Sequence, residues 1–464
     1  MATAPAVAPS SLLTLPDELL ASILDHFADA QAPTLLASAR VCKRLGKIAT
    51  ERIYSSVSLN LGGRTTNAFT RTLDQNPGRH ALVECLALYP EWDFDEDGQK
   101  DEEEVKQGHA AKCCSIIRSL PELRQLELHF FHGSVMGAIL SDEGVQAALQ
   151  NLQGLELEEP EYDHEDAIWW PSLARFPALA TLQIFDTGIF DYISSTPNIR
   201  TPLTNITEVT LSINDLPDQA AQTIASVFPN LVSLAVGETA GEGCISAVIE
   251  KMPTSIKRLI LYYVSETSSI SEAAWTRLRD LQDLRLCEYA CDVKQSLPQF
   301  SRSRIKTLSL GNDMDVPDQC LAALVAGPQR MPCLRRLTLR HAWVSSIAHL
   351  HGEIARLIPD TEPDRFERLK TQYKPKWPEG HTEAGFARAV EIARKAGIQV
   401  VGGALECIGW EQRFDEAVER QLVDHAVRTD DFSSLDQVLG REEGTAAIRR
   451  LRPNLASRLG ASLL

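Results

Sequence analysis

The amino-acid sequence predicts an α/β protein. A helical N-terminal module is followed by an irregular solenoid of strand–helix repeats and then by a helical C-terminal cap. Three observations lead to this prediction. An apolar motif recurs at a near-constant interval, it overlaps short stretches of alternating apolar and polar residues, and the two ends of the chain show helical patterns instead. A unit that cannot bury its own apolar face becomes stable when neighbours stack on it.

Residues 11–57 contain two apolar stripes at helical spacing, after a segment (1–10) that we expect to be disordered. Pro16 suits the first position of a helix, and Asp17 and Glu18 favour the positive end of its dipole. The first stripe consists of Leu19, Leu20, Ile23, Leu24 and Phe27, and the second of Leu35, Leu36, Ala39, Cys42, Leu45 and Ile48.

This module resembles an F-box. The matching residues are LPDELL from Leu15 to Leu20, Ile23-Leu24, VCKRL from Val41 to Leu45, and Ile53-Tyr54; the tryptophan frequent near this end is absent. The resemblance implies three helices that dock an exposed apolar face onto the Skp adaptor of a cullin-based ubiquitin ligase. The residues expected on that face are Leu15, Pro16, Leu19, Leu20, Ile23, Val41 and Leu45. The alternative is a module that only caps the repeats.

The repeats are expected over residues 58–405. The motif apolar-x-x-apolar-x-apolar begins at Val83, Leu123, Leu152, Leu179, Ile206, Leu231, Ile256, Leu281, Ile305 and Leu334. The steps are 40, 29, 27, 27, 25, 25, 25, 24 and 29 residues, and all but the first fall within a period of about 20–29 residues. Over residues 80–345 the chain resembles the leucine-rich-repeat family, although the usual asparagine after each strand is mostly missing. We expect about ten to eleven units, with parallel strands on a concave face and helices on a convex face.

Between the strands, helical spacing predicts helices at 217–228, 243–251 and 317–326. One further strand is expected at 398–401, which makes residues 345–395 a long insertion or a last helix pair. Residues 406–464 are expected to form the C-terminal cap, with helices at 411–428 and 433–461.

The net charge of −17 is concentrated in two acidic stretches. Residues 91–104 carry nine acids and one lysine, and residues 156–166 carry seven acids and no base. A net-acidic chain argues against general nucleic-acid binding, which requires a cationic face. Asp93, Asp95, Asp97, Gly98 and Glu104 fit a calcium-binding loop, but such a loop needs flanking helices and a repeat strand precedes it. The prediction is a solvated acidic insertion at 91–104.

The ten cysteines include no CxxC pair, which favours reduced thiols in the cytoplasm or nucleus. No secretory signal, membrane-spanning run, metal-site spacing, phosphate loop or nucleophile motif is present in the sequence. We therefore expect neither a cofactor, a metal nor a membrane partner.

Function is expected on the concave face. Outward strand positions are acidic in early repeats (Glu127, His129, Glu156 and Glu158) and basic in later ones, and the expected target-binding residues are Glu127, Glu156, Arg258, Tyr262, Arg285, Arg336 and Arg340. The basic half suits an acidic or phosphorylated peptide.

The chain is thus predicted to be a non-catalytic substrate-recognition adaptor that brings a target to the Skp adaptor and cullin. The alternatives are an interaction scaffold outside the ubiquitin system and an enzyme with an unrecognised site.

Overall fold

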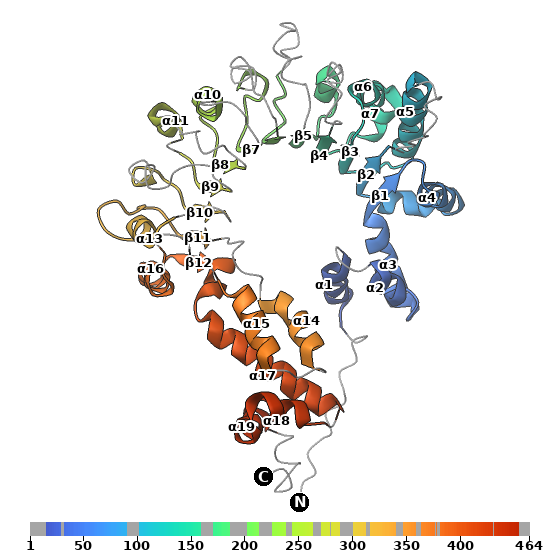
Figure 1. Ribbon diagram of the computed structural model, residues 1–464. Coiled ribbons are helices and arrows are strands. Elements are labelled where there is room, and N and C mark those ends of the chain that lie inside the picture. The colour runs from blue at the N-terminus through green and yellow to red at the C-terminus, as the bar shows by residue number, and fades with distance from the viewer. Residues whose placement is uncertain are drawn as a thin grey trace, which may run out of the picture. The chain divides into compact units, whose positions relative to one another are not determined.

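A computed structural model gives the structure of the 464-residue chain (Figure 1). It describes residues 15–28, 32–90, 102–158, 170–185, 202–212, 225–237, 244–262, 271–278, 280–287, 300–311, 316–339, 347–358, 363–375, 377, 381–429 and 431–453. The chain forms two compact units, Met1–Ser255 and Ile256–Leu464.

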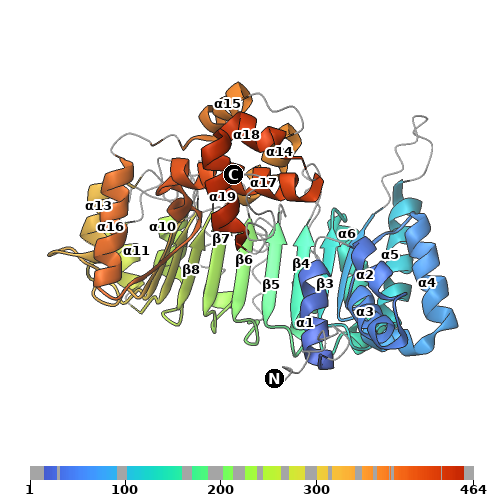
Figure 2. The ribbon, with the colours of Figure 1, turned by 90° about the horizontal axis from the view of Figure 1, so that it is seen from below.

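The first unit contains a sheet of parallel strands in which each strand pairs with its predecessor in the chain (Figure 2). The described strands are β1 (Ser56–Asn60), β2 (Cys85–Tyr89), β3 (Gln125–His129), β4 (Gly154–Glu158), β5 (Thr181–Phe185), β6 (Glu208–Ser212) and β7 (Ser233–Gly237). Equivalent repeat positions lie side by side, so that Leu126 pairs with Leu86 on one side and with Leu155 on the other. Parallel pairing requires a crossover after every strand, which the segments between the strands supply.

Alternate side chains of these strands are buried in one continuous core. Eighteen motif positions of this unit are at most 2% exposed: Val83, Leu86, Leu88, Leu123, Leu126, Leu128, Leu152, Leu155, Leu157, Leu179, Leu182, Ile184, Ile206, Val209, Leu211, Leu231, Leu234 and Val236. Burial of each such side chain contributes about 1.5–3 kcal/mol relative to its exposure. The predicted α/β solenoid of leucine-rich-repeat type is therefore confirmed, and its motif positions form the core.

Helices cover one face of this sheet (Figure 1). They are α4 (Arg64–Gln75), η2 (Pro77–Leu82), α5 (Glu102–Arg118), α6 (Gly133–Ser141), α7 (Glu143–Ala148), η3 (Trp170–Arg175) and α10 (Cys244–Lys251). The prediction at 243–251 corresponds to α10, whereas most of the prediction at 217–228 lies outside the described residues.

Three helices precede the sheet: α1 (Asp17–Ala28), α2 (Ala32–Ser38) and α3 (Lys43–Ser55). Their shared core consists of Leu20, Leu24, Leu35, Leu45, Ile48 and Ala49. Helix α3 runs directly into β1 and contacts it. The sequence did not predict β1, because its stretch SVSLN is largely polar and only Leu59 is buried.

The second unit continues the same repeat. Its described strands are β8 (Arg258–Leu261), β9 (Asp283–Leu286), β10 (Thr307–Leu310), β11 (Arg336–Leu339) and β12 (Gln399–Val401), all parallel. Helices α11 (Glu272–Arg277), α13 (Asp318–Val325) and α16 (Glu383–Lys395) lie between strands in the chain. The strand predicted at 398–401 is β12, and the helix predicted at 317–326 is α13.

Helices α13 and α16 of consecutive repeats pack together through Asp318. The Asp318 carboxylate lies 3.1 Å from Nδ1 of His381 and accepts a hydrogen bond of 3.0 Å from the Thr382 backbone amide. Thr382 is the N-cap of α16, and its hydroxyl accepts a hydrogen bond of 2.9 Å from the amide of Gly385. The Thr382 hydroxyl also lies 3.5 Å from the Asp318 carboxylate, so one charged group with three polar contacts joins the last repeat to its neighbour.

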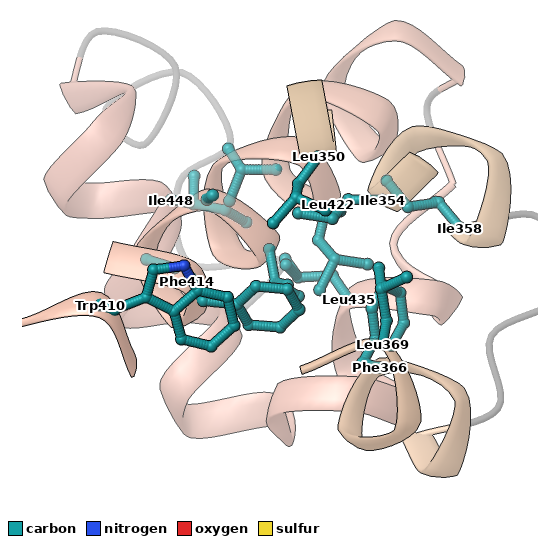
Figure 3. Close-up of a cluster of buried hydrophobic side chains, with 14 residues drawn as sticks. Leu350, Ile354, Ile358, Phe366, Leu369, Trp410, Phe414, Leu422, Leu435 and Ile448 are labelled. Atoms are coloured by element: carbon teal, nitrogen blue, oxygen red, sulfur yellow. The ribbon is translucent and has the colours of Figure 1, made fainter. Parts of the chain in front are cut away.

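A helical bundle completes this unit. It consists of α14 (Ile347–Leu357), α15 (Pro363–Tyr373), α17 (Trp410–Thr429), α18 (Ser433–Leu439) and α19 (Arg441–Leu451), with the short helix η5 (Gly403–Cys407) before α17. Its separate core includes Leu350, Ile354, Phe366, Phe414, Leu422 and Ile448 (Figure 3). The bundle is built from two chain segments that flank the last repeat. The single helix predicted at 433–461 is wrong, because Gly440, with φ 81°, separates α18 from α19 and residues beyond 453 lie outside the described part.

A ladder of polar side chains joins repeats just before their strands. The Asn205 side-chain amide donates to the carbonyls of Phe176 and Leu179, at 2.9 and 2.7 Å, and that of Asn230 donates to Thr204 at 2.7 Å. In the next repeat the Ser255 hydroxyl donates to the Leu231 carbonyl. In these repeats the polar residue that bonds the neighbouring repeat therefore lies immediately before the motif, and not after the strand as the asparagine of regular leucine-rich repeats does.

Candidate interaction surfaces

The three-helix module exposes large apolar side chains. Leu19 and Ile23 on α1 are 51% and 37% exposed, Leu36 on α2 is 51% exposed, and Val41 before α3 is 66% exposed. Among the described residues these four are the majority of the large hydrophobic side chains that are exposed; the others are Phe130, Val232 and Val427. Their concentration on one small module is a sign of a partner-binding surface.

The structure divides the residues predicted to face the Skp adaptor into two groups. Pro16, Leu19, Ile23 and Val41 are exposed, and Leu15 is half-buried. Leu20 and Leu45 belong to the module's own core, at 1% and 6% exposed. These two residues therefore stabilise the module and do not form its surface, because packing of α1 against α3 selects one side of each apolar stripe.

Polar contacts hold the start of α1 against α3. The Arg44 guanidinium donates 2.6 Å hydrogen bonds to the Asp17 carboxylate and to the Leu15 carbonyl. Gly46 permits the close approach of α3 to α2, since a Cβ atom there would lie 2.8 Å from the Ala39 carbonyl oxygen. The exposed apolar residues are thus presented by a fixed arrangement of helices.

A second surface lies on the sheet of the first unit, on the face opposite the helices. The register places Glu127 of β3 beside Glu156 of β4, and His129 beside Glu158. Neighbouring strands are about 4.8 Å apart, so these side chains adjoin directly. Like charges in such positions repel each other. The sequence-predicted outward residues Glu127 and Glu156 are therefore brought together by the fold.

His129 links the carboxylates of this surface. Its Nδ1 lies 2.7 Å from a Glu158 oxygen and its Nε2 lies 3.3 Å from a Glu127 oxygen. The ring is 8% exposed and stacks on Tyr89, with ring centroids 4.6 Å apart. Burial disfavours the charged imidazolium, but hydrogen bonds to Glu158 and Glu127 outweigh burial and raise the pKa of His129.

Glu156 is compensated less, because His129 acts on it through charge and not through a hydrogen bond. No hydrogen bond or ion pair from another described residue reaches its carboxylate, which is half-buried. Burial and the neighbouring charge of Glu127 raise the pKa of Glu156. Beside it, Gln125, Glu127, Gln153, Gly154, Thr181 and Gln183 line an open hollow of about 380 Å³.

The basic residues predicted in the second unit are partly neutralised. Asp283 of β9 lies opposite Arg258 of β8 and two residues before Arg285, with its carboxylate 3.5 Å from Arg258 Nε and 3.7 Å from an Arg285 nitrogen. Sequence reasoning missed this pairing, although Asp283 occupies an outward strand position. Arg336 is exposed on β11 and Tyr262 is half-buried after β8. Arg340 lies outside the described residues.

The calcium-loop residues Asp93, Asp95, Asp97 and Gly98 also lie outside the described residues, while Glu104 is in α5. Within the part of the chain that the structure describes, no group of three or more His, Cys, Asp or Glu residues is placed to hold a metal ion. In the same described residues, no helix is both long and apolar enough to cross a membrane.

No family model and no curated protein matches this chain. Among solved structures, similar chains come from the Rad7 and Elc1 complex of yeast (15% identity, TM-score 0.36, covering 72% of this chain and 82% of that one) and the leucine-rich repeat-containing protein LegL7 of Legionella pneumophila (13%, 0.37, 73% and 98%). An internalin of Listeria monocytogenes is also similar (13%, 0.28, 74% and 91%). All three TM-scores are below 0.5, so the assignment of the fold rests on the repeats, strand register and burial described above.

Proposed function

We propose that this chain is the substrate-recognition adaptor of a Skp–cullin–F-box ubiquitin ligase. The observation that carries the proposal is the exposure of Leu19, Ile23, Leu36 and Val41 on the three-helix module. Apolar surface buried on binding contributes about 25 cal/mol per Å², and such surface is normally minimised on a module that has no partner. The LPDELL and VCKRL stretches give this partner its proposed identity, through the resemblance to an F-box.

In this proposal the chain performs no chemistry of its own. The helical module holds the Skp adaptor, through which the cullin is recruited, and the uncovered sheet faces hold a target protein. Another subunit of the ligase transfers ubiquitin. The adaptor raises the effective concentration of the target near that subunit, which accelerates transfer without a catalytic group in this chain.

The experiment is an affinity purification from cell extract, with mass spectrometry of the captured proteins. The wild type is compared with Leu19→Lys/Ile23→Lys, which places two charges on the exposed side of α1 and leaves its core intact. The matched control is Val232→Lys/Val427→Lys, which charges two similarly exposed valines elsewhere.

The expected result is that Skp adaptor and cullin accompany the wild type and the control but not the α1 variant. Loss of an apolar anchor at the centre of an interface costs about 2–4 kcal/mol, or roughly 30- to 1,000-fold in affinity. If the α1 variant captures both proteins as well as the wild type does, the exposed face of α1 is not the docking surface. If the wild type captures neither protein, the ligase assignment is wrong.

An interaction scaffold outside the ubiquitin system is the second candidate. It is favoured by the direct contact of α3 with β1 and η2, because this contact also makes the module an N-terminal cap for the repeats. The two functions differ in whether cullin is captured. A scaffold would retain its protein targets in both the wild type and the α1 variant, with no cullin in either sample.

A further inference from the structure

The uncovered face of strands β2 to β6 is acidic. Its positions, taken from the strand register, are Cys85, Ala87, Tyr89, Gln125, Glu127, His129, Gly154, Glu156, Glu158, Thr181, Gln183, Phe185, Glu208, Thr210 and Ser212. These include four glutamates and neither lysine nor arginine. The equivalent face in the second unit differs, since arginines there adjoin an aspartate.

Charge on this face is incompletely balanced. His129 is shared between Glu127 and Glu158, so even a protonated imidazole compensates only one negative charge of that pair. Glu156 stands beside Glu127 in the register and forms no ion pair with a lysine or arginine of the described residues. A partner that brings a positive group between these two carboxylates would reduce their repulsion.

An exposed aromatic group lies at the end of the same face, beside Tyr89 and His129. Phe130 follows β3 with φ 61° and is the only described non-glycine residue with a positive φ. Its side chain is 37% exposed, and its ring centroid lies 6.5 Å from that of Tyr89 and 6.3 Å from that of His129. The face of an aromatic ring attracts ammonium and guanidinium groups.

The hollow beside Glu127 and Glu156 gives room for an extended chain. Besides these two carboxylates it is lined by the amides of Gln125, Gln153 and Gln183, which both donate and accept hydrogen bonds. Its volume of about 380 Å³ is sufficient for a long side chain.

We propose that this face binds an extended basic segment of a partner protein, with a lysine or arginine side chain between Glu127 and Glu156 and a neighbouring residue of the segment against the exposed Phe130 ring. This inference rests on the proposed adaptor function, for which it names the chemical class of the target segment. It also assigns recognition of the target to the sheet face of the first unit. The arginines of the second unit are partly neutralised and are not the proposed recognition surface. An acidic or phosphorylated segment would be repelled here.

The test measures binding of a fluorescent peptide of alternating lysine and glycine to the full chain by anisotropy. A glutamate–glycine peptide of equal length serves as the reference ligand. The variant Glu127→Gln/Glu156→Gln removes the two carboxylates, and Phe130→Asn removes the ring at a position where asparagine tolerates the positive φ. The control Glu122→Gln/Glu143→Gln gives the same change in net charge at two exposed acids outside this face.

The expected result is binding of the lysine peptide only, weakened about tenfold or more by the double variant at 127 and 156 and less by Phe130→Asn. The control should bind as the wild type does. Equal weakening in the control, or binding of the glutamate peptide, overturns the proposal, as does an unchanged affinity in the double variant. Capture of Skp adaptor and cullin is scored separately, so the two proposals are able to fail independently.

Discussion

The contact between α13 and α16 predicts that a glycine-to-alanine substitution destabilises the protein at position 385 but stabilises it at position 352. In Gly385→Ala, the new Cβ would lie 2.1 Å from an Asp318 carboxylate oxygen and 2.8 Å from the Thr382 hydroxyl. Atoms do not approach so closely, so the carboxylate has to move. Asp318 then loses its contacts with His381 and with the Thr382 amide.

The magnitude follows from three contributions. Overpacking at a fixed contact costs about 1–3 kcal/mol. Loss of a hydrogen bond to a charged group costs about 1.5–3 kcal/mol, and alanine returns about 1 kcal/mol of helix propensity. We expect Gly385→Ala to reduce the free energy of unfolding of the last repeats by about 1.5–5 kcal/mol.

The matched control is Gly352→Ala in α14, where no atom lies within 4 Å of the added Cβ. Here only helix propensity acts, and we expect a gain of about 0.5–1 kcal/mol. Urea unfolding, together with hydrogen exchange of the α13 and α16 amides, measures both changes. If Gly385→Ala is neutral or stabilising, Asp318 is not a fixed link between these two repeats.

Three further predictions concern the first unit. Leu20→Ala, at a core position, should destabilise the helical module by about 2–5 kcal/mol, whereas Leu19→Ala at the surface should change its stability by less than about 0.5 kcal/mol. Hydrogen exchange of the amides of α1 to α3 measures the stability of the module in both variants. Asn205→Ala removes the side-chain donor shared by the Leu179 and Phe176 carbonyls, of which Phe176 keeps its bond from the Leu179 amide. It should lower the free energy of unfolding by about 1–3 kcal/mol, measured by urea titration, whereas the exposed Asn151→Ala should have little effect. The pKa of His129 is raised in the fold, so its stabilising contribution should be complete below the unfolded pKa of about 6.5 and should disappear as pH rises through the folded pKa. The free energy of unfolding of His129→Gln should therefore differ from that of the wild type more at acidic than at alkaline pH. A difference that does not change with pH would contradict this.

The repeat was predictable because its signal lies along the chain. Leu123 and Leu152 are one repeat apart and occupy equivalent positions in consecutive repeats. Because equivalent positions are buried alike, the burial of such residues follows from their spacing in the sequence. Strand β1 was missed because its buried residues are too few to produce a pattern. The break at Gly440 was missed because a glycine inside a helical pattern is tolerated in many helices, and only its positive φ ends this one.

The surfaces were less predictable. The apolar stripe of α1 was recognised, but the sequence does not tell which side packs against α3, and Leu20 proved to be core while Leu19 is surface. The outward position of Glu127 and Glu156 followed from strand alternation, which is local. The contact between Glu158 and His129 depended on register between strands, as did the neutralisation of Arg258 by Asp283.

The sequence by itself determined the repeat, its α/β class and the outward positions of its strands, because these depend on periodicities of two residues and of about 25 residues along one chain. The tertiary structure decided which apolar residues of α1 to α3 remain exposed and which charges meet across strands. It also decided that α14 and α15 pack with α17 to α19 in one core, although the last repeat separates them in the chain. These outcomes depend on contacts between residues far apart in the chain, for which local spacing carries no information.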